Sequence, residues 1–160
     1  MSTLYDADTA LWAEEQAALL RRRAAEQANN DELDWLHLAE EIEGVVASEK
    51  REVRWRLALI VQHLLKWQYQ PALRSRSWQT TLHVQRRDLH AVLADSPSLR
   101  SFAASVLAAA FVHGRHDAEQ ETGLLHLPTD CPWTLEQVLD QAFLPDVYEG
   151  ERPGLIPWPL

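Results

Sequence analysis

The side chains best suited to metal chemistry are histidines and carboxylates at helical spacing. His37 and Glu40 stand three residues apart, as do His116 and Glu119, and His113 precedes His116 by three. On a helix this spacing puts two side chains on one face, as a metal site requires. Di-metal carboxylate bundles carry Glu-x-x-His, whereas this chain has only the reversed order. Seven histidines among 24 acids produce such pairs by chance, so we predict no metal and no cofactor.

Patterns typical of nucleophilic catalysis or nucleotide binding are absent from the sequence. There is no glycine-flanked serine elbow and no glycine-rich loop before a predicted helix. Cys131 is the single cysteine, and its neighbours Asp130 and Pro132 offer no cation that would lower its pKa. The sequence therefore predicts no catalytic residue. Whether the protein is an enzyme stays open, and the lack of a motif favours a non-enzymatic protein.

A basic, tryptophan-containing segment is the best candidate for binding a partner. We define the basic corner as Lys66, Trp67, Gln70, Arg74, Arg76 and Trp78. Arginines stack on indole rings, and such a set can hold a phosphate or a carboxylate. The alternative is structural, with both tryptophans in the core and the arginines paired with acidic residues.

Charge is distributed unevenly around this segment. The formal net charge is −9. Residues 26–53 carry nine acids against two bases, residues 54–100 eight bases against two acids, and residues 101–160 nine acids against two bases. A basic middle that packs beside acidic helices explains this pattern, and so does a patch for an anionic partner. The overall negative charge argues against nucleic acid as that partner.

The elements that would position these residues are helices. The sequence has few glycines and is rich in Ala, Leu, Glu, Gln and Arg, which favour helices, so it predicts an all-α fold. We expect an irregular bundle of four main helices plus a short C-terminal helix, with the long second helix as its spine. The first helix starts at Asp6 or Asp8 and ends before 29–31, the second spans 32–70, the third 78–94 after a cap at Ser75 or Ser77, the fourth 97–122, and the last 135–141 after a cap at Thr134.

Apolar residues recur along the second helix at spacings of three, four and seven. They are Leu38, Ile42, Val45 or Val46, Val53, Leu57, Ile60, Leu64 and Trp67, and the spacing predicts a buried seam. Glu49 and His63 fall close to this seam, either in a half-buried polar network or at the edge of a drifting stripe. A rival hypothesis is a metal-binding or hydrolytic bundle, with a site among Glu40, Glu49, His63, His113, Asp117 and Glu121. A polar cavity with converging carboxylates would favour that rival.

The sequence also predicts how the chain is organised and where it works. We expect one domain over residues 1–145 and an irregular, proline-rich tail over 146–160. The N-terminus lacks a basic flank followed by an apolar run, and the longest apolar run, 106–112, is too short to span a bilayer. We therefore expect a cytoplasmic protein with no membrane partner. A homodimer is compatible with a long helix and an exposed tail.

Several segments, in their order along residues 4–145, resemble one bacterial family. HLLKWQYQP at 63–71, RSRSW at 74–78 and CPWTLEQVLD at 131–140 are the most specific of them. Their order is similar to that of the family called domain of unknown function 29. The resemblance implies an all-helical, cytoplasmic protein without a known activity. We therefore favour a non-enzymatic interaction module that binds a protein or a small anionic partner through the basic corner.

Overall fold

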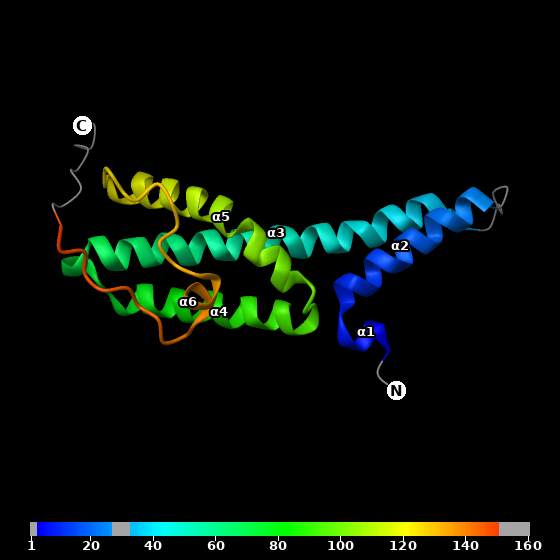
Figure 1. Ribbon diagram of the computed structural model, residues 1–160, viewed down its shortest axis with the longest axis horizontal. Helices are drawn as coiled ribbons and strands as arrows, with labels where there is room; N and C mark the ends of the chain where they lie inside the picture. The colour runs from blue at the N-terminus through cyan, green and yellow to red at the C-terminus, as the bar shows by residue number, and fades with distance from the viewer. Residues whose placement is uncertain (1–2, 27–32, 151–160) are drawn as a thin grey trace. The chain divides into compact units, whose positions relative to one another are not determined.

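The computed structural model describes residues 3–26 and 33–150, and these residues form helices and no strand (Figure 1). The helices are α1 (Leu4–Ala7), α2 (Thr9–Glu26), α3 (Trp35–Tyr69), a 3-10 helix η1 (Pro71–Leu73), α4 (Arg76–Asp95), α5 (Leu99–Thr122) and α6 (Leu135–Leu139). Four of the described helices are long, and α6 is short. The predicted all-α fold class is confirmed.

The first predicted helix corresponds to α2, and a short helix α1 that the sequence did not predict precedes it. Asp8 separates α1 from α2 because its backbone is extended, with φ −162° and ψ 98°. Its carboxylate accepts a hydrogen bond from the Leu11 amide at 2.8 Å, so it caps α2 as one of the two predicted caps. The predicted break at 29–31 lies outside the described residues.

Proline and hydroxyl residues set the other helix ends. The helix α3 begins at Trp35, three residues later than predicted, and ends at Tyr69 because Pro71 cannot continue a helix. Of the two candidate caps for α4, Ser75 is used: its Oγ accepts from the Trp78 amide at 3.3 Å. The predicted cap Thr134 forms a capping box with Gln137 at the start of α6.

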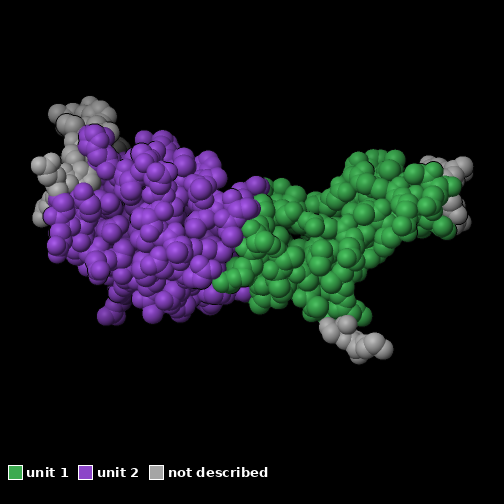
Figure 2. All heavy atoms as spheres, viewed as in Figure 1, with its two compact units in different colours: residues 1–52, 91–102 green, residues 53–90, 103–160 purple. Residues whose placement is uncertain are grey.

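The chain divides into two compact units, coloured separately in Figure 2. Unit 1 contains residues 1–52 and 91–102, and unit 2 contains residues 53–90 and 103–160. The boundaries fall inside α3, α4 and α5, so each of these helices contributes to both units. The single domain over residues 1–145 stays a prediction.

Unit 1 combines a small-residue core with a buried polar network. Its core contains Ala10, Ala13, Ala17, Ala39 and Val46, which are small enough to let helices approach closely. Ser96 is fully buried, and its Oγ accepts from the Ala10 amide at 3.1 Å and donates to Glu49 Oε2 at 3.1 Å. Asp8 also accepts from the Ser98 amide and hydroxyl, at 2.5 and 2.9 Å. Ser96 and Ser98 therefore hold the start of α2.

Unit 2 has the larger aliphatic core. It contains Val53, Leu57, Ile60, Leu64, Leu82, Leu89, Phe111, Val138 and Leu139. Gly114 on α5 is buried, and a Cβ atom there would lie 2.3 Å from the Ala58 carbonyl oxygen of α3. Glycine is therefore required where these two helix backbones meet. The charged side chains of Lys66 and Arg86 are also buried in this unit, at 3% and 1% exposure.

The predicted seam of α3 holds from Val46 to Leu64 and fails before Val46. Leu38 and Val45 are exposed, at 40% and 58%, and Ile42 and Trp67 are half-buried. Val46 is the buried member of the Val45/Val46 pair, because a helix turns neighbouring residues about 100° apart. The apolar spacing alone could not distinguish the part of the helix that other elements cover.

Candidate functional site

The basic corner lies in unit 2, at the end of α3, on either side of η1 and in the first turn of α4. Because Pro71 ends α3 and η1 reverses the chain, residues 66–78 stay close together. Their side chains nevertheless take two different roles. The inner part is centred on Lys66, which is paired and buried within the unit. The outer part comprises Gln70 and Arg76, with Arg74 linking the two parts, and its cations form no ion pair with a described carboxylate.

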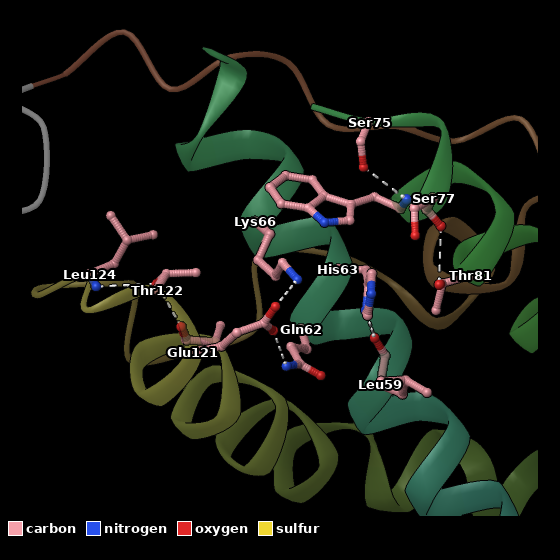
Figure 3. Close-up of polar contacts among 12 residues, drawn as sticks. Leu59, Gln62, His63, Lys66, Ser75, Ser77, Thr81, Glu121, Thr122 and Leu124 are labelled. Carbon is pink, nitrogen blue, oxygen red and sulfur yellow. Dashed lines mark hydrogen bonds and ion pairs between the residues drawn. The ribbon is translucent and has the colours of Figure 1, made fainter. Parts of the chain in front are cut away.

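Lys66 is the centre of the inner part. Its side chain is 3% exposed, its Nζ lies 2.5 Å from Glu121 Oε1 of α5, and it lies 4.6 Å from the centroid of the Trp78 ring. Gln62, one turn before Lys66 on α3, donates to the other Glu121 oxygen at 2.8 Å. Figure 3 shows Gln62 and Lys66 reaching the same carboxylate. The charge of Lys66 is therefore satisfied inside the unit.

His63 lies one turn before Trp67 and is also buried. Its Nδ1 is 2.9 Å from the Leu59 carbonyl oxygen, so this nitrogen carries a proton and donates (Figure 3). Burial lowers the pKa of His63, the Lys66 charge lowers it further, and the Leu59 carbonyl and Glu121 oppose the shift. His63 is therefore a neutral imidazole at neutral pH.

The residues of the rival metal or hydrolytic hypothesis do not form one cluster. His63 and Glu121 lie in unit 2 near Lys66 of the corner, while His113 and Asp117 are exposed on α5. Glu40 and Glu49 belong to unit 1, where Glu49 accepts from Ser96 and Glu40 is exposed. Within 3–26 and 33–150, no group of three or more His, Cys, Asp or Glu residues is placed to hold a metal ion.

Arg74 links the two parts of the corner. Its Nε donates to the Trp67 carbonyl oxygen at 2.9 Å, and its guanidinium lies 4.6 Å from the centroid of the Trp67 ring. The Nη2 atom of Arg74 is enclosed and has no hydrogen-bond partner in the described part of the chain. Part of this side chain is thus structural, and part of its donor capacity is unused.

Arg76 and Gln70 complete the outer part. Arg76 is exposed, is the first residue of α4, and forms no ion pair with any described carboxylate. The helix dipole is positive at the N-terminus of α4, so it disfavours the charge of Arg76 and does not neutralise it. Gln70 is half-buried just before η1.

A protein-family comparison can now be set beside this geometry. A family model described as a domain of unknown function, DUF29, matches residues 4–144. The chain belongs to this family. The resemblance noted from the sequence is therefore confirmed over almost the same range.

One solved structure is similar to this DUF29 chain. It is the crystal structure of an alpha-helical protein of unknown function from Rhodospirillum rubrum ATCC 11170. The TM-score is 0.74 and the identity 22%, over 89% of this chain and 93% of that one. At this identity the likeness supports the all-α fold alone.

None of the curated proteins matches the chain. No helix in the described ranges is both long and apolar enough to cross a bilayer.

Two residues that contact one another beside Lys66 were not foreseen as neighbours of the corner. Gln62 precedes Lys66 by four residues on the same helix, a spacing at which side chains meet, so the sequence held a signal for it. Glu121 lies 55 residues from Lys66 and was foreseen only in the rival metal site. Nothing in the sequence shows which acid of α5 reaches α3.

Proposed function

We propose that the protein is a non-enzymatic interaction module that binds an anionic group of a partner at the outer part of the basic corner. One contrast carries this proposal. Lys66 has Glu121 as its counter-ion, whereas neither Arg74 nor Arg76 has a carboxylate partner among the described residues. Two neighbouring guanidinium groups without counter-ions favour a bound anion over a purely structural role.

The chemistry of the outer part suits a phosphate or a carboxylate. A guanidinium offers parallel N–H donors that match two oxygens of either group. Stacking on Trp67 holds the Arg74 plane in place, which reduces the entropy lost on binding. Leu73 lies between Pro71 and Arg74 and is 60% exposed, so it offers apolar contact to a protein that carries the anion.

A titration with inorganic phosphate tests this function. We expect saturable amide chemical-shift changes in the ¹⁵N spectrum at residues 74–78, and at least severalfold weaker binding for Arg76→Gln. Arg87→Gln is the matched control, because Arg87 is also exposed on α4 but pairs with Asp88 at 2.7 Å. The proposed function fails if phosphate leaves residues 74–78 unchanged, or if the two variants bind it equally.

A further inference from the structure

Arg86 is a buried cation with an incompletely used guanidinium. It lies on the buried face of α4 with Leu82 and Leu89, and it is 1% exposed. Its Nε donates to the Val138 carbonyl oxygen of α6 at 2.8 Å, while His90, one turn on, approaches the Leu139 carbonyl oxygen at 2.9 Å. These contacts satisfy the last carbonyls of α6. The Nη2 atom is enclosed and has no hydrogen-bond partner in the described structure.

No described carboxylate forms an ion pair with Arg86. Burial lowers the pKa of Arg86 to about 10, and the field of Asp140 acts in the opposite direction. The side chain is therefore still charged at neutral pH. A buried charge with neither a counter-ion nor a full set of hydrogen bonds is costly, so a stable fold needs something to compensate it.

A cavity is lined in part by Arg86. It measures about 220 Å³ and is lined by Gln79, Leu82, His83, Arg86, Gln141 and Leu144. Its rim is held by His83 and Gln141: His83 Nδ1 lies 3.1 Å from Gln141 Oε1, and Gln141 Nε2 donates to the His83 carbonyl oxygen at 3.2 Å. The lining contains one cation, no acid, three other polar side chains and two leucines.

We propose that this cavity binds a carboxylate carried on a short aliphatic chain, with Arg86 as its counter-ion. At about 30 Å³ per water molecule the space holds several waters, and thus a carboxylate with a few carbon atoms. A carboxylate matches the planar donor fork of one arginine, and Leu82 and Leu144 supply apolar contact for the chain. A phosphate dianion would need further cations, which the lining does not have.

The proposed site is separate from the basic corner in residues and in ligand. A free short-chain acid and the C-terminal carboxylate of a partner peptide share the required chemistry. Two sets of probes distinguish them: butyrate and butyramide, and N-acetyl-glycyl-leucine as the acid and as the amide. We would titrate each into the ¹⁵N-labelled full chain at constant ionic strength and follow the amides of residues 79–86 and 141.

We expect saturable shifts with butyrate and none with butyramide. Arg86→Gln should weaken butyrate binding at least about tenfold, since it removes a charge-assisted hydrogen bond. The matched control Arg87→Gln removes an exposed charge from the same helix and should bind as the unaltered protein does. If Arg86→Gln does not fold, Gln79→Trp gives the same test, because it fills the cavity from an exposed position and keeps Arg86.

If N-acetyl-glycyl-leucine binds more tightly than butyrate, the ligand is the C-terminus of a partner. If butyrate binds more tightly, the ligand is a free short-chain acid. Three results would overturn the site. They are no saturable butyrate shift at residues 79–86, equal binding by butyramide or by the Gln79→Trp variant, and tighter binding of phosphate at these same residues.

Discussion

The ion pair between Lys66 and Glu121 predicts an unequal response to losing either partner. Lys66 is 3% exposed, whereas Glu121 is 50% exposed. Glu121→Ala would leave a buried ammonium group with only the Trp78 ring as a favourable neighbour. Lys66→Met would leave an exposed carboxylate that water can solvate and that Gln62 still contacts. The first change should therefore destabilise the protein far more than the second.

Magnitudes for the two changes follow from burial. Leaving a buried charge unpaired costs about 3–5 kcal/mol in closed sites. Because the carboxylate end of this pair is half exposed and the cation–π contact remains, we expect about 2 kcal/mol for Glu121→Ala. Lys66→Met keeps the packing and should stay within about 1 kcal/mol of the unaltered protein. Alanine is a good helix former, so α5 itself is not weakened.

Urea and thermal unfolding of the full chain measure this difference. For a chain of this length, about 2 kcal/mol corresponds to a fall in Tm of about 4–8 °C. The double variant should behave like Lys66→Met, because the stranded charge is then gone. Glu43→Ala is the control, since its ion pair with Arg21 is exposed on both sides and its loss should matter less. Equal losses for Glu121→Ala and Lys66→Met would refute the asymmetry.

Two further predictions concern the helix contact at Gly114 and the buried histidine. Gly114→Ala should lower the free energy of unfolding by about 1–3 kcal/mol or more, because its Cβ would meet the Ala58 carbonyl oxygen at 2.3 Å. Gly44→Ala, with no atom within 4 Å of the added Cβ, should raise it by up to about 1 kcal/mol, and a fall in Tm would contradict this. The lowered pKa of His63 means that the unfolded chain binds its proton more readily, so stability should fall as the pH drops below about 6.5. Urea unfolding at several pH values should show that the free energy of unfolding falls less at low pH for His63→Gln than for the unaltered protein. An identical pH dependence of the two would show that His63 does not cause the fall.

Much of the fold could be predicted from the sequence because its signals are local. Pro71 ends α3, Ser75 and Thr134 cap the helices that follow them, and aliphatic spacing marks the buried face from Val46 onwards. The short helix α1 was missed, because part of what fixes its junction with α2 is distant. Ser98, 90 residues later, supplies two of the hydrogen bonds that hold the Asp8 carboxylate.

The candidate site was predictable to a lesser extent for the same reason. The basic corner is contiguous, so its members could be grouped from the sequence. Whether Lys66 is paired depends on Glu121, which only the packing of α5 against α3 places beside it. Arg86 was overlooked although it stands between Leu82 and Leu89 at spacings of four and three. An arginine inside an aliphatic stripe is a sequence signal for a buried charge.

The two-segment make-up of unit 1 has a consequence for biosynthesis. The start of α2 depends on Ser96 and Ser98, which the ribosome adds almost 90 residues after Asp8 and Ala10. At about 5–20 residues per second, the N-terminal segment waits about 5–20 s for these partners. During that interval the Asp8 carboxylate lacks its Ser98 donors and the Ala10 amide lacks the Ser96 hydroxyl. The start of α2 is thus made before α5, yet it cannot complete its native contacts until α5 begins to emerge.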